Sequence, residues 1–258
     1  MTDVTTTEPI TVRFPTDAEA AASQDTEWCE VEVGGEKLTI RFHDDHEIYA
    51  IPGLYERIFY EHLQCRSPEE VVGLLSELLE QAGDDPAALR ALDVGAGNGL
   101  VGEQLKRLGV PAIVGVDIIP EAAAAAARDR PRVYDDYVVC DLTDLDAGER
   151  ARIGDQPPTC MTTVAALGFD DIPPRAFAEA YNLAAGDAWV AFNIKADFLD
   201  QVDESGFRGL IRRMVREDVY EVIASRRYIH RLSIAGEPLE YVAVVGRKRA
   251  DVPAEWSG

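Results

Sequence analysis

The residues best suited to chemistry begin with a glycine-rich turn between an expected strand and an expected helix. The turn comprises Asp93, Val94, Gly95, Ala96, Gly97, Asn98 and Gly99. Glycines let a backbone turn tightly and approach a ligand where a Cβ would collide, and open parallel sheets bind ligands at such strand ends. The dinucleotide pattern G-x-G-x-x-G needs a glycine at position 100, which is leucine here. The turn therefore indicates a ligand site and disfavours a pyrophosphate.

Aspartates recur 24 residues apart, at positions 93, 117 and 141. Asp117 closes the second expected strand and Asp141 the third, so we expect three carboxylates to line one edge of a sheet. Asp117 is placed to bond both hydroxyls of a ribose, and Asp141 to accept from the exocyclic amine of an adenine flanked by Ile118 and Leu142. Asp93 beside the glycines would repel a diphosphate. The pattern predicts a nucleoside ligand with a cationic tail.

The elements that must position these residues alternate between strand and helix from residue 88 to 194. The expected strands are short and mostly apolar, as strands covered on both faces must be: Leu89–Val94, Ala112–Asp117, Tyr137–Asp141, Thr159–Ala165 and Ala188–Ile194. The expected helices are Leu100–Leu108, Pro120–Arg128, Asp144–Arg152 and Pro174–Ala184. The alternation predicts an α/β, doubly wound, mainly parallel sheet. A helix near Phe207–Val215 and an antiparallel pair within Tyr220–Ile234 and Leu239–Val245 would follow.

The segment before the sheet is expected to form a cap. Residues 1–26 lack apolar periodicity and predict a flexible acidic tail. Trp28–Val33 and Lys37–Phe42 alternate about a Gly-Gly turn and predict a β-hairpin. An aromatic-rich helical stretch runs from Glu47 to Leu63 with a break at Pro52-Gly53, and a further helix is expected to begin at Ser67, whose side chain would cap it.

Four segments together resemble the successive motifs of Rossmann-like S-adenosylmethionine-dependent methyltransferases. They are Ala91–Gly99, Val114–Asp117, Cys140–Leu142 and the strand 188–194. The resemblance covers residues 88 to about 247 and implies a seven-stranded sheet with an antiparallel last strand. It also implies that S-adenosylmethionine binds at the carboxyl edge and leaves as S-adenosylhomocysteine. The implied cofactor-binding residues are Asp93, Gly95, Ala96, Gly97, Gly99, Asp117, Ile118, Asp141 and Leu142, with Tyr49 and Tyr55 from the preceding segment.

The resemblance also sets expectations for domains, acceptor and mechanism. The expected divisions are a tail (1–26), a hairpin and helical cap (27–86), a cofactor-binding domain (87–250) and a C-terminal tail (251–258). No Asn/Asp-Pro-Pro-Tyr follows the fourth strand, which favours a small-molecule acceptor over nucleic-acid or protein amides. In-line methyl transfer needs alignment and no covalent nucleophile. The catalytic residues stay unknown; the candidates for a base are His46, Asp170, His62 and His230.

Each assignment has a structural alternative. The glycines could only turn the chain, Asp117 and Asp141 could cap helices, and Tyr49 and Tyr55 could belong to a buried aromatic stripe. Asp170 could begin the helix after Pro173-Pro174. The run from His43 to His46 is interpreted as a polar loop, and no metal site is expected. Two other functions stay open: an NAD-dependent oxidoreductase, and a methyltransferase-like module that binds without turnover.

Composition limits the partners. The chain has 258 residues, 47% of them hydrophobic, and a formal net charge of −22. Such a charge repels polyphosphates, so nucleic acid is an unlikely substrate. No apolar run approaches the roughly 20 residues that cross a bilayer, which predicts a cytoplasmic protein without a membrane partner. Four widely spaced cysteines indicate core thiols, and the oligomeric state is not predicted.

Overall fold

A seven-stranded sheet forms the centre of the protein. The computed structural model describes residues 10–15, 26–167, 172–196 and 206–256. The sheet has the order β6-β5-β4-β7-β8-β10-β9. Its strands are β4 (Arg90–Val94), β5 (Ala112–Asp117), β6 (Asp136–Val139), β7 (Cys160–Thr163), β8 (Trp189–Lys195), β9 (Tyr220–Leu232) and β10 (Pro238–Lys248). β10 alone runs opposite to the other six strands, so the predicted sheet with an antiparallel last strand is confirmed.

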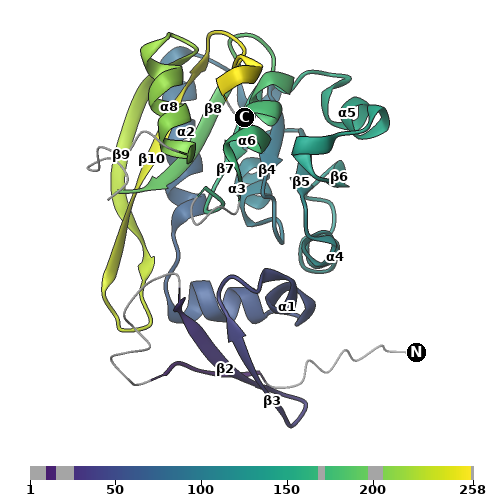
Figure 1. The fold of residues 1–258 in the computed structure, drawn as a ribbon, viewed down its shortest axis with the longest axis vertical. Helices are drawn as coiled ribbons and strands as arrows, with labels where there is room; N and C mark the ends of the chain where they lie inside the picture. The colour runs from purple at the N-terminus through teal and green to yellow at the C-terminus, as the bar shows by residue number, and fades with distance from the viewer. Residues whose placement is uncertain (1–9, 16–25, 168–171, 197–205, 257–258) are drawn as a thin grey trace.

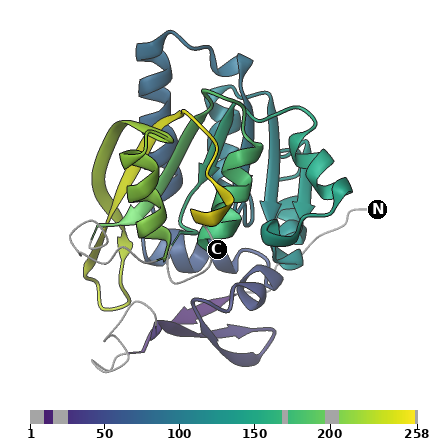
Figure 2. The same cartoon turned by 45° about the horizontal axis from the view of Figure 1, so that its top comes forward.

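Helices cover both faces of this sheet (Figures 1 and 2). On one face α2 (Ser67–Ala82) and α3 (Leu100–Leu108) pack on alternate side chains of the strands. On the other face lie α5 (Ala147–Gly154), α6 (Pro174–Leu183) and α8 (Gly206–Arg216). The helix α4 (Pro120–Asp129) packs against β5 and β6. Burial of both faces explains why these strands are almost continuously apolar.

The N-terminal part forms a second, smaller layer beyond the carboxyl edge of the parallel strands (Figure 1). The predicted hairpin is present as β2 (Trp28–Val33) and β3 (Glu36–Arg41). It is followed by α1 (Asp45–Ala50) and, after the predicted break, by a π-helical segment η2 (Glu56–His62). We call residues 27–63 the cap. Its core packs Cys29, Val31 and Ile40 of the hairpin against Ile48 and Ile58 of the helices.

Two local predictions are wrong. Residues 1–26 were expected to form a flexible tail, but Thr11–Arg13 form the strand β1. This strand is ordered because it pairs antiparallel with β2. Three residues of strand give too little periodicity to detect. Ser67 does not cap α2: it is the first helical residue, and its Oγ instead lies 2.6 Å from His230 Nδ1 and 2.7 Å from the Tyr228 hydroxyl. The Ser67 hydroxyl is thus used to satisfy two buried polar side chains, and it is not available to cap the helix.

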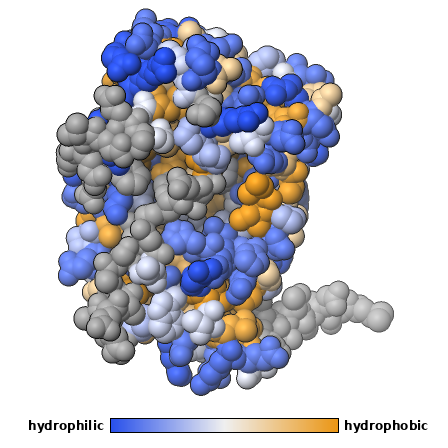
Figure 3. Space-filling model, in the orientation of Figure 1, coloured by the Kyte–Doolittle hydropathy of each residue, from blue (hydrophilic) through white to orange (hydrophobic). Residues whose placement is uncertain are grey.

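The surface agrees with the composition. Hydrophilic residues predominate on the face seen in Figure 3, with smaller apolar patches between them. Within the described part of the chain, no helix is both long and apolar enough to cross a membrane.

Candidate functional site

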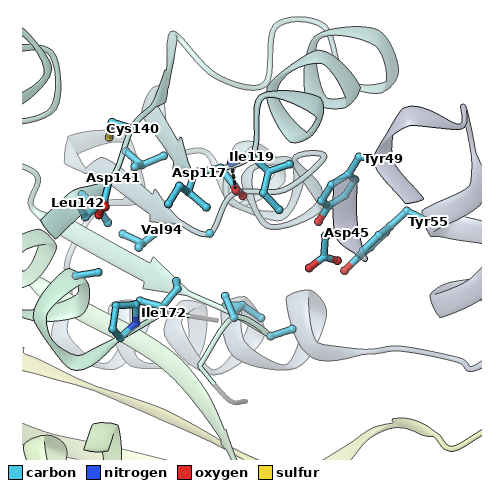
Figure 4. A pocket seen from close by; sticks show the side chains of 18 residues that line it. Asp45, Tyr49, Tyr55, Val94, Asp117, Ile119, Cys140, Asp141, Leu142 and Ile172 are labelled. Carbon is cyan, nitrogen blue, oxygen red and sulfur yellow. Dashed lines mark hydrogen bonds between the residues drawn. The ribbon is translucent and has the colours of Figure 1, made fainter. Parts of the chain in front are cut away.

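A slot lies between the carboxyl ends of the parallel strands and the cap (Figure 4). The turn after β4, the ends of β5 and β6, the segment after β7 and the first turn of α6 form one side, and α1 with Tyr55 forms the other. The lining residues are Asp45, Tyr49, Tyr55, Val94, Gly95, Val116, Asp117, Ile118, Ile119, Cys140, Asp141, Leu142, Val164, Ala165, Ala166, Ile172, Pro173 and Ala176. This is the sheet edge at which the sequence predicts a ligand site.

Asp117 is held rigidly at the middle of the slot. Its Oδ2 accepts the backbone N–H of Gly97 at 2.9 Å, and its Oδ1 accepts that of Ile119 at 3.0 Å. Burial raises the pKa of this carboxyl, while the two amides oppose the shift. A carboxylate has about four acceptor positions, so these two bonds leave capacity for a diol. The neighbouring Ile118 is 62% exposed, the highest value among the large apolar residues that the structure describes.

The glycine turn is shaped by two close approaches. Gly95 has φ of +70°, and a Cβ there would lie 2.7 Å from Ala166 Cβ, in the segment after β7 on the same side of the slot. Gly97 has φ of +52°, and a Cβ there would lie 2.5 Å from the Tyr49 hydroxyl oxygen. Gly95 lines the slot, whereas Ala96, Gly97 and Gly99 do not. The side chain of Tyr49, which comes from the cap, therefore fills the space beside Gly97.

Asp93 does not lie at the edge of the slot as expected. It is fully buried, and its carboxylate accepts hydrogen bonds from the Tyr134 hydroxyl at 2.7 Å and from Thr162 Oγ1 at 2.8 Å. Burial raises its pKa to about 6. The physical reason is its position: Asp93 precedes the last residue of β4, so its side chain points into the protein beneath the turn. Only Asp117 and Asp141 of the three predicted carboxylates line the slot.

Asp141 lines the far end of the slot and also caps a short helix. Its Oδ1 accepts the backbone N–H of Thr143 at 2.8 Å and the Thr143 hydroxyl at 2.7 Å. These bonds lower the pKa of this exposed carboxyl. The capping alternative is thus present, and it is compatible with a role in the slot because Leu142 and Cys140 line the same end.

Two tyrosines of the cap close the other end of the slot. The rings of Tyr49 and Tyr55 stack with centroids 5.1 Å apart. Burial raises the pKa of both hydroxyls. Arg128 of α4 donates to the carbonyl of Tyr49 at 3.2 Å. The two tyrosines and Asp45 point into the slot from the right in Figure 4. Asp45 was read from sequence as part of a polar loop; it instead begins α1 and lines the slot.

The cap is fastened to the glycine turn by a partly buried ion pair. Glu56 Oε1 accepts from Asn98 Nδ2 at 2.9 Å and from Arg130 at 2.8 Å. The same guanidinium donates to the carbonyl of Asn98 at 3.2 Å. The cap and the turn therefore meet through one shared set of hydrogen bonds.

The candidate bases do not gather at the slot. His46 and His62 are not among its lining residues. His230 is buried in a polar cluster and does not itself line the slot, and burial lowers its pKa to about 3. Asp170 lies outside the described residues.

The polar cluster around His230 reaches the slot through a residue that the sequence analysis missed. Asn193 is 1% exposed; its Oδ1 accepts the N–H of Ala165 at 2.7 Å, and its Nδ2 donates to the Tyr228 hydroxyl at 2.7 Å. Ala165 lines the slot with φ of +57°, a strained value for a residue with a Cβ. The sequence offered one signal for Asn193, because it is a polar residue within the otherwise apolar strand 188–194.

Comparison with known proteins agrees with this architecture. A family model described as "Methyltransferase domain" matches residues 92–192, which include the glycine turn and the ends of β5, β6 and β7. The sheet domain has the methyltransferase fold. This confirms the predicted fold class and the stated resemblance. No curated protein matches.

Solved structures share the methyltransferase fold at low sequence identity. Magnesium protoporphyrin IX methyltransferase of Synechocystis, with bound S-adenosylhomocysteine, is 12% identical with a TM-score of 0.52 and covers 75% of this chain and 92% of its own. The N-methyltransferase NodS of Bradyrhizobium japonicum, with the same ligand, is 11% identical with a TM-score of 0.52 (80% and 97%). An RNA methyltransferase candidate from Pyrococcus horikoshii is 15% identical with a TM-score of 0.50 (70% and 83%).

Proposed function

We propose that the protein is an S-adenosylmethionine-dependent methyltransferase acting on a small-molecule acceptor. The observation that carries the proposal is the position of Asp117, a rigid carboxylate in the slot wall beside the glycine turn and the exposed Ile118. A ribose diol needs such an acceptor pair, and an adenine needs apolar surface. The methyltransferase fold and the two relatives crystallised with S-adenosylhomocysteine support it.

The residues present fit this cofactor. Asp117 would hold the ribose, and Ile118, Leu142 and Ile172 supply apolar walls for the adenine, with Asp141 at its amine edge. Among the described lining residues there is no lysine or arginine, which suits a cationic sulfonium and disfavours a diphosphate. When bound, S-adenosylmethionine supplies an electrophilic methyl group.

The protein contributes alignment and exclusion of water. The cap covers the slot with Tyr49 and Tyr55, and the turn bonds of Asp117 hold its carboxylate in one orientation. Alignment of two reactants can lower a barrier by about 7–11 kcal/mol without a covalent nucleophile. Burial keeps the two tyrosine hydroxyls protonated, so they orient ligands and do not serve as bases at neutral pH.

A small acceptor is proposed because residues of the cap, Asp45, Tyr49 and Tyr55, cover one end of the slot. The absence of the Asn/Asp-Pro-Pro-Tyr motif in the sequence also supports it. The net charge of −22 opposes a nucleic acid.

Titration calorimetry with S-adenosylhomocysteine tests the proposal. The protein should bind it, and Asp117→Ala should reduce the affinity at least tenfold. Asp135→Ala is the matched control, because Asp135 also accepts a backbone N–H of β5, that of Ile113 at 2.8 Å, away from the slot. Equal affinity for the Asp117 variant would refute the site. Binding of NADH in place of S-adenosylhomocysteine would favour the oxidoreductase alternative, and binding without label transfer from a radiolabelled donor to a metabolite extract would favour the module without turnover.

A further inference from the structure

We propose that the methyl acceptor is an amine whose nitrogen lies beside Asp45, at the cap end of the slot; this inference rests on the proposed function. It is argued from the charge and the side chains of that end of the slot. It names a substrate class that the fold and the family model do not specify.

The slot has a nucleoside part and a cap end. Asp117 and Asp141 mark the part of the slot that suits ribose and adenine. The opposite end is built by Asp45 and Tyr49 of α1 together with Tyr55, and in Figure 4 their oxygen atoms point toward the open part of the slot. Asp45 is therefore the one lining carboxylate, among the described residues, that the nucleoside does not account for.

The charged side chains that line the slot are all acidic among the described residues. The described lining contains three carboxylates and no histidine, lysine or arginine. A carboxylate, phosphate ester or phenolate acceptor placed beside Asp45 would face a like charge, and no basic side chain of the described lining would offset that repulsion; only the donor's sulfonium would attract it. An amine carries no negative charge at any stage, and its ammonium form is attracted by Asp45 and by the faces of tyrosine rings.

Methyl transfer to an amine would keep a positive charge in the slot. An amine that binds as an ammonium ion first gives up one proton, which Asp45 can accept and pass to solvent. The nitrogen lone pair then forms the N–C bond while the C–S bond breaks, and the electron pair of that bond stays on sulfur. The positive charge passes from sulfur to nitrogen. The carboxylates that favour the cationic donor thus still face a cation after transfer, which would not hold for an acceptor that ends neutral.

The wall opposite the cap determines the size and polarity that suit the remainder of the acceptor molecule. Ala165, Ala166 and Ile172 provide small and apolar surface there. Together with the two tyrosine rings, they suit an amine with a flat or apolar body rather than a polyhydroxylated one.

Three probes of similar size and different charge test the inference: benzylamine, benzyl alcohol and benzoate. Each is titrated calorimetrically into the protein saturated with S-adenosylhomocysteine. We expect benzylamine to bind at least tenfold more tightly than either of the other two. Asp45→Asn should weaken benzylamine at least fivefold and change the affinity for S-adenosylhomocysteine less than twofold. Asp44→Asn is the matched control: Asp44 pairs with Arg41 at 2.7 Å, does not line the slot, and its loss should leave all affinities unchanged.

The outcomes separate this inference from the proposed function. Failure of the wild-type protein to bind S-adenosylhomocysteine would contradict the proposed function itself. Binding of S-adenosylhomocysteine with no preference for benzylamine would overturn the amine proposal alone. A loss of S-adenosylhomocysteine affinity in Asp45→Asn as large as the loss of benzylamine affinity would assign Asp45 to the donor and also overturn it.

Discussion

The Tyr49 hydroxyl occupies the space where a side chain at Gly97 would begin. A Cβ on Gly97 would lie 2.5 Å from that oxygen, closer than side chains approach in folded proteins. Gly97 is therefore constrained by a side chain of the cap, so the cap and the glycine turn are in direct contact.

Gly97→Ala should weaken S-adenosylhomocysteine binding at least tenfold, because it displaces Tyr49 and strains the turn that orients Asp117. Gly83→Ala is the control: Gly83 also has a positive φ, +73°, but nothing lies within 4 Å of its added Cβ. It should lower stability by about 1 kcal/mol and leave binding unchanged. In the double variant Gly97→Ala/Tyr49→Phe, calorimetry should recover part of the affinity; no recovery would mean that backbone strain alone is responsible.

The buried carboxyl of Asp93 should make stability depend on pH. Its pKa is about 6 in the folded protein and near 3.8 in the unfolded chain, so the folded state binds the extra proton as pH falls through 6. Its contribution to stability is therefore lower above pH 6 and greater in acid. Relative to Asp93→Asn, the wild-type protein should gain about 1 kcal/mol in free energy of unfolding between pH 7.5 and pH 5. Urea unfolding of both proteins at the two pH values measures this; a difference that does not change with pH would contradict it.

Asn193 should fix the backbone at Ala165. Asn193→Ala removes the acceptor for the Ala165 N–H, so hydrogen exchange at that amide should speed up at least tenfold, and stability should fall by about 1–3 kcal/mol. Ser67→Ala breaks bonds to Tyr228, His230 and the Nδ2 of Asn193 in the same cluster, but it leaves the bond from the Ala165 N–H to the Oδ1 of Asn193. It should destabilise the protein while leaving exchange at Ala165 near the wild-type rate; equal acceleration in both variants would show that the cluster acts only as core packing.

The sequence was sufficient for the parts of the site that follow from strand order. Parallel strands end at one edge, so Asp117, Asp141 and the turn at Gly95 meet there, as predicted. The sequence was not sufficient where the direction of a side chain decides whether a residue lines the slot. Asp93 is one residue before the end of β4, and the pleat turns it inward. The contribution of Asp45 depends on the docking of α1 against α4, a long-range contact with no local signal.

The same long-range docking gives a test of the cap. Glu56 bonds both Asn98 and Arg130, so Glu56→Ala removes the acceptor shared by the glycine turn and the guanidinium. Arg130 is only 12% exposed, and without Glu56 it keeps the longer ion pair with Glu103 at 3.3 Å but loses its shorter carboxylate contact, which leaves its charge poorly compensated at the junction. The variant should weaken S-adenosylhomocysteine binding and increase proteolysis between residues 50 and 57. Glu61→Ala removes a carboxylate of the same segment whose partner Arg57 is exposed, and it should do neither. Unchanged proteolysis and affinity in Glu56→Ala would mean that the aromatic contacts alone hold the cap in place.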